Sequence, residues 1–321
     1  MLRMILAAAA LMAATMGAQA QQGWPNKPVK ILVPTAAGGT ADATARLFAQ
    51  YVSKTLGQQF YVENRGGAGN TLGIESVVRS PADGYTLLLG AGTIAINHLI
   101  YKKLPYDVLR DLAPVTQMIS LPNVLVVHPS QPMKTLADYI AAAKAAPGKI
   151  DYASAGVGSN LHMAMELLKF RTGIEVTHVP YKGVGPALQD TLAGHVMSMV
   201  SNAASAKPQI DAGKLRALGV TSLKRSAALP DVPTFDEQGV KGYEVLNWFG
   251  LFAPAGTPKP IVDKVAAEAR RIWALPEVQE QLKNAGADAA LSESPEAFAA
   301  FSRAERVKWG EVVKASGVKI E

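Results

Sequence analysis

Apolar and polar positions alternate along this chain in two periods, which predicts strands interleaved with helices. Residues 29–33 form a short β-branched apolar run, and apolar side chains then recur at helical spacing from residue 45 until Gly57. Thr40 or Asp42 is expected to cap that helix. The other expected strands are 59–63, 85–89, 113–118, 124–127, 150–153, 176–179, 196–200, 215–220 and 243–253, and the other expected helices are 71–79, 136–146, 160–170, 186–193, 203–211, 259–274, 277–285 and 295–316.

This order of elements predicts an α/β fold with two lobes of the doubly wound type. A chain of 321 residues is long enough for about two domains. The extended segments near residues 114–127 and 245–253 are the expected crossings between them. Lobe one is expected to comprise residues 21–123 and 247–321, and lobe two residues 124–246. Two crossings predict a hinged cleft, with a ligand between the lobes at the carboxyl ends of the strands.

The N-terminus has the features of a secretory signal peptide of 20 residues. Arg3 lies in a short basic start, residues 5–16 are apolar, and Ala18 and Ala20 form a small-residue cleavage site. A membrane anchor is the alternative, but this apolar stretch is far shorter than the ~20 residues that cross a bilayer. The mature protein is therefore expected to start near Gln21 and to be exported.

Composition excludes several classes of protein. Hydrophobic residues make up 49% of the chain and charged residues 18%, which excludes a chain kept unfolded by its charge. The net charge is +6, but the basic residues are scattered, so nucleic-acid binding is not expected. The chain has no Cys, which excludes disulfides, thiolate metal sites and a lipoprotein anchor.

No enzymatic motif is present. His162 and Glu166 share a helix face without a third metal ligand, so a solvated pair is expected there and no metal. Motifs for a serine nucleophile, a phosphate loop and a dinucleotide site are missing, and no cofactor is expected. A secreted α/β hydrolase or isomerase remains an alternative, with Asp42 and His162 as its titratable candidates.

Five small, hydroxyl-rich loops connect expected strands to expected helices. Helix N-termini present unpaired N–H groups and a partial positive charge, and Gly, Ser and Thr allow a ligand to approach the backbone. Such loops bind a carboxylate or a phosphate without Lys or Arg, although each of them alone is more often an ordinary cap. Because all five lie at the same end of their strands, they predict a binding site for an anion. They span residues 35–42, 65–71, 90–93, 154–160 and 201–205.

Eight stretches carry a more specific signal, and they cover the mature chain in order. They are 33–42 (VPTAAGGTAD), 62–70 (VENRGGAGN), 81–90 (PADGYTLLLG), 152–156 (YASAG), 178–183 (HVPYKG), 215–221 (LRALGVT), 229–234 (LPDVPT) and 248–258 (WFGLFAPAGTP). As a set they resemble the Bug family, the extracytoplasmic receptors of tripartite tricarboxylate transporters. The resemblance implies a two-lobed periplasmic binding protein fold of type II, closing over a small carboxylate without catalysis. It also implies a monomer whose partner is a membrane permease of that type, with a periplasmic sensor domain as the alternative partner.

The resemblance also implies which residues form the site. In the family, the loop after the first strand supplies backbone groups, and further loops grip a ligand carboxylate through N–H and hydroxyl groups. The matching positions in the first loop are Thr35, Ala37, Gly38, Gly39, Thr40 and Asp42. Those in the other loops are Gly92 and Thr93 in lobe one, and Ala155, Gly158, Ser159, Asn160, Asn202 and Ser205 in lobe two.

The chain departs from its relatives at positions that bear on the ligand. Ala36 and Ala37 stand where relatives commonly have prolines, and Met197 and Ser201 stand where relatives often have acidic residues. Without an acidic group to pair with an ammonium, a ligand with one or two carboxylates, or an aromatic acid, is expected rather than an amino acid or a cation. Two basic residues, Arg65 and Lys182, either reach the anion or lie exposed or in structural salt bridges.

Overall fold

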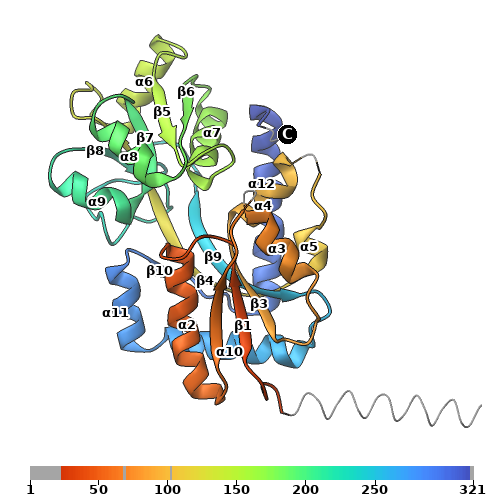
Figure 1. Ribbon diagram of the computed structural model, residues 1–321. Coiled ribbons are helices and arrows are strands. Elements are labelled where there is room, and N and C mark those ends of the chain that lie inside the picture. Colours follow the sequence, from red (N-terminus) through yellow and green to blue (C-terminus); the bar gives the residue numbers. More distant parts are fainter. Residues whose placement is uncertain (1–22, 68–69, 102, 319–321) are drawn as a thin grey trace, which may run out of the picture.

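Two groups of strands, joined by two long strands, organise the molecule (Figure 1). The computed structural model describes residues 23–67, 70–101 and 103–318, and the expected signal peptide, residues 1–20, lies outside them. The strand order is β2-β1-β3-β9-β4-β7-β5-β6, with β8 and β10 also paired to β4. We call the part built on β2, β1, β3 and β9 lobe one, and the part built on β7, β5, β6 and β8 lobe two.

Lobe one is a sheet covered by helices on both faces. Strands β1, β2 and β3 pair in parallel, whereas β9 runs antiparallel to β3 and to β4. Successive residues of a strand face opposite sides, so Ile31 packs with α2 and α10, while Leu32 packs with α3 and α4. The elements are β1 (Val29–Val33), α2 (Thr40–Leu56), β2 (Phe60–Asn64), α3 (Thr71–Val78), β3 (Thr86–Ala91), α4 (Thr93–Ile100), α5 (Val108–Asp111), β9 (Leu246–Pro254), α10 (Lys259–Trp273), α11 (Pro276–Asn284), β10 (Asp288–Ala289) and α12 (Pro295–Ser316).

Lobe two repeats the alternation of strand and helix. Its strands β7, β5 and β6 are parallel to one another, and β7 and β8 run antiparallel to the end of β4. Residues 221–245, between β8 and β9, form turns held by the bridge between Val220 and Thr234. The elements are α6 (Leu136–Ala145), β5 (Asp151–Ser154), α7 (Asn160–Thr172), β6 (Thr177–Pro180), α8 (Val184–Leu192), β7 (Ser198–Asn202), α9 (Ala203–Asp211) and β8 (Arg216–Val220).

A single strand, β4 (Leu112–Val127), belongs to both lobes. It pairs with β9 as far as Pro122, opposite Leu246, and with β7 from Asn123, opposite Asn202. The expected crossing near residues 114–127 is thus the continuous strand β4, and the one near residues 245–253 is β9, which pairs with it. Together they make the fold a two-lobed α/β architecture of the type II binding-protein kind.

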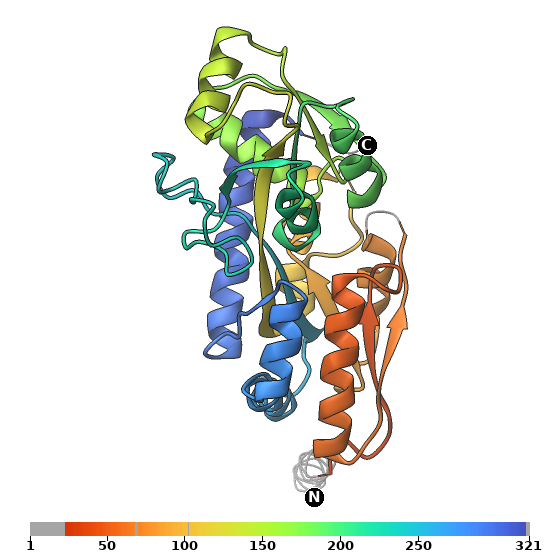
Figure 2. The ribbon, with the colours of Figure 1, turned by 90° about the vertical axis from the view of Figure 1, so that its left-hand side faces the viewer.

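The C-terminal helix α12 connects the two lobes along one side of the molecule (Figure 2). Near its start, Phe298 is buried in the lobe-one core with Ile74 and Trp248. Near its end, Trp309 and Val312 are buried in the core that contains the lobe-two strands. The helix therefore packs against α4 of lobe one and α7 of lobe two.

Most expected elements occur within two or three residues of their predicted bounds, and the differences have local causes. Gly39, in extended backbone, is the N-cap of α2, so the predicted caps Thr40 and Asp42 were wrong and lie in the first turn. The helix ends at Gly57 as expected, in the left-handed region. Helix α4, which follows the loop 90–93, had no predicted bounds, because its sequence TIAINHLI has almost no polar face; Ile94, Ala95, Ile96 and Asn97 are all buried.

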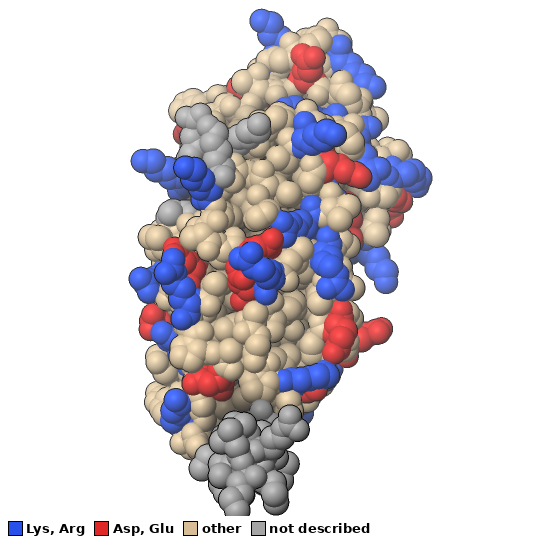
Figure 3. All heavy atoms as spheres, turned by 90° about the vertical axis from the view of Figure 1, so that its right-hand side faces the viewer, with Lys and Arg blue, Asp and Glu red and all other residues tan. Residues whose placement is uncertain are grey.

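Charged side chains are spread over the face of the molecule in Figure 3, where Lys and Arg lie among Asp and Glu and form no extended patch of one sign. Within the described ranges, every helix is too short or too polar to span a membrane.

Candidate functional site

Four junctions between a strand and the following helix bring the predicted site residues to the boundary between the lobes. In lobe one, β1 leads to α2 through residues 34–39, and β3 leads to α4 through Gly92. In lobe two, β5 leads to α7 through residues 155–159, and β7 leads directly from Asn202 into α9. Within each lobe these strands are parallel, so their carboxyl ends share one sheet edge.

Strand β9 holds one junction from each lobe at neighbouring positions. The Gly92 N–H of lobe one donates to the Trp248 carbonyl at 2.9 Å, and Asn160 Nδ2 of lobe two donates to the Leu246 carbonyl at 3.1 Å. Carbonyls two residues apart on a strand are about 7 Å apart and point the same way. The starts of α4 and α7 therefore lie close together on β9.

Asn123, on β4, connects the lobe-two junctions to β9. Its side chain is fully buried, and its Nδ2 donates to Asn160 Oδ1 at 2.9 Å and to the Val245 carbonyl at 3.2 Å. Asn202 lies directly opposite it in the β4–β7 ladder. Backbone carbonyls can only accept, so they fix the orientation of the Asn123 and Asn160 amides. This network holds the starts of α7 and α9 against the strands that cross between the lobes.

The helix starts at the junctions differ in how they are capped. Helices α2, α4 and α9 have no side-chain cap, whereas Ser159 caps α7 by accepting from the His162 N–H at 3.2 Å. Away from the junctions, Asp107, Thr135 and Ser294 cap α5, α6 and α12, whereas α3, α8, α10 and α11 also have no side-chain cap. Asn202 is the N-cap of α9, yet its buried Oδ1 has no hydrogen-bond partner within the described chain. First-turn N–H groups of α2, α4 and α9 thus remain without a side-chain acceptor, which favours an anion there.

Some of the predicted backbone donors already have partners inside the protein. The Gly38 N–H donates to Asp42 Oδ2 at 2.9 Å, and the Gly158 N–H donates to His162 Nδ1 at 3.0 Å. Together with the Gly92 N–H, these groups shape their loops and are not free for a ligand in this conformation. Of the predicted site residues, Ala37, Gly38, Gly39 and Ser205 are exposed, Thr35, Thr40, Thr93, Ala155, Ser159 and Asn202 are half-buried, and Asp42, Gly92, Gly158 and Asn160 are buried.

Asp42 braces the first loop. Its carboxylate accepts from Arg46 Nε at 3.0 Å as well as from the Gly38 N–H. Arg46 and these hydrogen bonds lower the pKa of Asp42. Arg46 also contacts Asn64 Oδ1, and Asn64 Nδ2 donates to the Thr35 carbonyl at 3.2 Å. This chain of contacts joins both ends of the loop 35–42, so Asp42 shapes the loop.

Behind the α7 junction lies a buried polar network that the sequence did not predict. His162 and Glu166 are each only 4% exposed, so the expectation of a solvated pair was wrong. The His162 ring stacks on the His178 ring at 4.0 Å, and Glu166 accepts from Tyr152 Oη and from Lys169 Nζ, at 2.9 and 2.8 Å. Burial lowers the pKa of His162 to about 3 and the pKa of His178 to about 4. Two stacked rings can share this space because both are neutral.

One pair in this network has the distance of a nucleophile and its base. Ser154 Oγ lies 2.6 Å from His178 Nε2. Ser154 is fully buried, however, and its Oγ also bonds to both the N–H and the carbonyl of Gly156. The pair therefore supports the turn at Gly156 and offers no reachable nucleophile. Within the described ranges, no three His, Asp or Glu side chains gather as a metal site would require.

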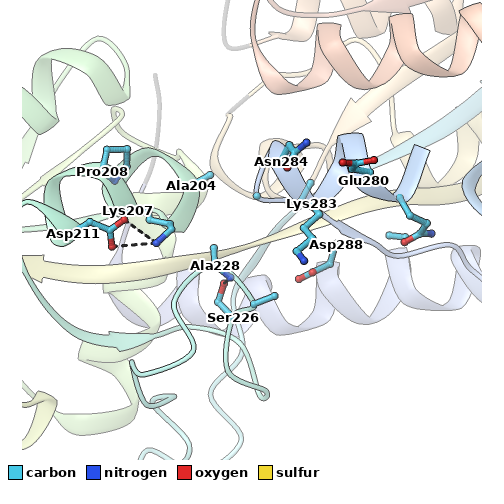
Figure 4. A pocket seen from close by; sticks show the side chains of 15 residues that line it. Ala204, Lys207, Pro208, Asp211, Ser226, Ala228, Glu280, Lys283, Asn284 and Asp288 are labelled. Carbon is cyan, nitrogen blue, oxygen red and sulfur yellow. Dashed lines mark hydrogen bonds and ion pairs between the residues drawn. The ribbon is translucent and has the colours of Figure 1, made fainter. Parts of the chain in front are cut away.

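Two hollows lie beside helix α11 of lobe one and the residues that follow it. One of about 300 Å³ is lined by Gly38, Gly39 and Thr40 together with α11 and Ile119. Another of about 970 Å³ lies between α9 and residues 226–228 of lobe two and residues 279–289 of lobe one (Figure 4). Its charged side chains have both signs, and Lys207 pairs with Asp211 at 2.8 Å. The lobes meet beside it, where a Cβ on Gly286 would lie 2.5 Å from Ala204 Cβ.

Sequence reasoning missed Asn123 and Trp248, which contact the junctions from distant segments. An asparagine inside the apolar run 119–127 was a usable signal, because a buried amide needs partners. Of the basic residues left open, Arg65 donates to Ser76 Oγ at 2.9 Å, and Lys182 is exposed.

Comparison with known proteins identifies the family. The description "Tripartite tricarboxylate transporter family receptor" applies to a family that matches residues 44–318. The chain belongs to this receptor family. Protein BugT of Bordetella pertussis is 35% identical over 93% of this chain and 92% of its own length, which confirms the resemblance to the Bug proteins.

Solved structures of other members have the fold of this receptor. R. palustris Rpa4515 with adipate superimposes with a TM-score of 0.81 at 37% identity, covering 92% of this chain and 99% of that one. MatC from Rhodopseudomonas palustris with bound malate superimposes with a TM-score of 0.77 at 35% identity, covering 90% and 100%. The family is one of receptors and not of enzymes, in keeping with the inaccessible Ser154.

Proposed function

We propose that this receptor is a monomeric periplasmic solute-binding protein that captures a small carboxylate between its lobes and delivers it to a membrane permease of the tripartite tricarboxylate type. The observation that carries the proposal is the meeting of α4 and α7 on β9, with Gly92 and Asn160 bound to carbonyls two residues apart. The residues inferred from the family resemblance belong to the four strand-to-helix junctions described above. The adipate and malate in relatives support a ligand with one or two carboxylates, and an aromatic acid fits the same donors.

The mechanism rests on hinge closure. We infer lobe boundaries at 21–123 with 247–321 and at 124–246, so that β4 and β9 form the hinge. A carboxylate held by helix N-termini of both lobes makes some contacts only when the lobes are closed, and these contacts shift the population toward closure. The permease then recognises the closed shape. A periplasmic sensor domain is the alternative recipient of the same shape.

A thermal-shift screen of residues 21–321 tests the ligand class. The panel comprises adipate, malate, citrate, benzoate, amino acids and sugars, applied before and after unfolding and refolding to remove any co-purified ligand. A ligand at a hundred times its Kd stabilises the protein by about 2.7 kcal/mol, which raises the Tm by several degrees. Shifts confined to carboxylates support the proposal. A flat response after refolding contradicts it.

Thr93 provides a substitution that separates binding from folding. It is the first residue of α4 after the N-cap Gly92, so T93D adds a negative charge where the helix favours one, by about 0.3–1 kcal/mol. The same charge repels a carboxylate ligand. We expect T93D to keep or raise the Tm and to lose carboxylate binding in isothermal titration, whereas the neutral T93N retains binding. Equal affinities of T93D and the wild-type protein would place the ligand elsewhere.

Delivery is tested with permease subunits reconstituted in liposomes. Uptake of the bound carboxylate that requires this receptor on the outer side supports a transport role. If uptake is independent of the receptor, a search for a sensor domain that binds only the liganded form becomes the next step.

A further inference from the structure

We infer that Glu305 is a positioning residue for the carboxylate site, acting through Trp248 on the start of α4. This inference rests on the proposed function and names a residue outside the ligand loops. Glu305 lies on α12, far in sequence from those loops, and is only 7% exposed.

The Glu305 carboxylate is fully engaged. Its Oε2 accepts from Nε1 of Trp248 at 3.0 Å and from Nε1 of Trp309 at 3.1 Å. Its Oε1 forms an ion pair with Lys308, one turn further along α12. A buried charge is tolerated when it is paired and hydrogen-bonded in this way. Two indoles sharing one carboxylate oxygen fix each other's orientation.

Trp248 contacts the proposed ligand site at Gly92, the N-cap of α4. The Gly92 N–H donates to the Trp248 carbonyl, and a Cβ placed on Gly92 would lie 3.0 Å from Trp248 Nε1. The indole is therefore the surface on which the N-cap of α4 rests. Phe298 and Phe301 pack edge-on against it, with centroids at 5.8 and 5.4 Å, and leave the ring little freedom to turn. If Glu305 releases the indole, the first-turn amides of α4 lose their fixed direction.

The second indole separates positioning from general support of the helix. Trp309 bonds to the same oxygen as Trp248, but it is buried in the core shared with lobe two, whereas the three atoms nearest to a Cβ on Gly92 all belong to Trp248. If Glu305 has only a structural role, replacing Trp248 and replacing Trp309 should affect ligand affinity equally. If Glu305 positions the site, replacing Trp248 should lower ligand affinity, whereas replacing Trp309 should lower only the stability of the protein.

The test measures adipate and malate binding by isothermal titration to the wild-type protein and to W248F, W309F, E305Q and W248F/E305Q. We expect W248F and E305Q each to raise Kd about tenfold, and the double variant to be no weaker than either single variant, because the two act as one unit. W309F should lower the Tm but change Kd less than about twofold. D107N, which breaks the ion pair of Asp107 with Arg306 of α12, is a further control for loosening this helix.

Fluorescence gives a readout that does not depend on E305Q folding. The chain has four Trp. A ligand-induced change of emission should persist in W309F and disappear in W248F. If Kd is unchanged in E305Q, or W309F and W248F weaken binding equally, the inference is wrong although the proposed function stands. If the wild-type protein binds neither these two nor any other carboxylate of the panel, both fail.

Discussion

At the scale of single residues, the role of a residue in the proposed site depends on the groups that pack against it. Gly92 is needed because the Trp248 indole occupies the space where a Cβ would be, with Nε1, Cε2 and Cδ1 at 3.0–3.3 Å. Asn202 occupies an N-cap position without capping, which leaves the start of α9 open. Neither property is visible in the residue type alone.

Replacement of Gly92 tests this close approach. In G92A the methyl group meets an indole that Glu305, Phe298 and Phe301 prevent from moving. We expect a loss of about 1–3 kcal/mol in the free energy of unfolding, typical of overpacking, together with weaker carboxylate binding. Urea unfolding and isothermal titration measure the two effects. Gly185, in α8 with no atom within 4 Å of its Cβ position, is the matched control, and G185A should be neutral or stabilising.

At the scale of elements, regular patterns were predictable and composite ones were not. Helices α9 and α12 have the predicted bounds, and in α12 the cap Ser294 and the terminal Gly317 are the local signals. Strand β4 was read as two segments, 113–118 and 124–127, since Pro122 interrupts a run that pairing with β9 and then with β7 makes continuous. The loops that we propose to bind the ligand were predicted from small residues after strands, and they lie at strand-to-helix junctions. Their supports could not be predicted, because Asn123, Trp248 and Glu305 reach them only through tertiary packing.

The stacked pair of His162 on α7 and His178 on β6 predicts a pH dependence of stability. Burial lowers the pKa of His162 to about 3 and of His178 to about 4, from the 6.5 that each has when unfolded. Below pH 6.5 the unfolded chain binds protons that the folded protein does not, so stability falls with pH and levels off only near pH 4 and below. Glu166 and Lys169 are the charged side chains beside this pair.

Urea unfolding at pH 7, 6 and 5 checks this dependence. Each histidine should cost about 1.4 kcal/mol for every pH unit between the two pKa values. H178Q should remove about half of that slope, if it folds, and H195Q, at a side chain that is 71% exposed, should leave it unchanged. A slope that H178Q does not alter would mean that carboxylates, and not this pair, set the acid limit.

At the scale of the whole molecule, the two lobes contact each other so closely at one point that an added methyl group would not fit between them. Gly286 has φ +65°, and a Cβ on it would lie 2.5 Å from the Cβ of Ala204, which belongs to the predicted ligand loop 201–205. G286A should therefore hold the lobes apart and weaken carboxylate binding, and the double variant A204G/G286A should restore it. Isothermal titration and small-angle scattering with and without ligand measure both effects. G57A, at φ +67° with open space around it, controls for backbone strain alone.

The path of α12 has a consequence for how the protein is made. The core around the lobe-two strands includes Trp309 and Val312, close to the C-terminal end of the chain. A domain folds during synthesis once all of its parts have emerged, and α12 follows every strand of both lobes in the sequence. Lobe two thus cannot complete its core until α12 has emerged. For a receptor that we propose to be exported, folding that waits for α12 keeps the precursor extended, which is the state in which a chain passes through a membrane.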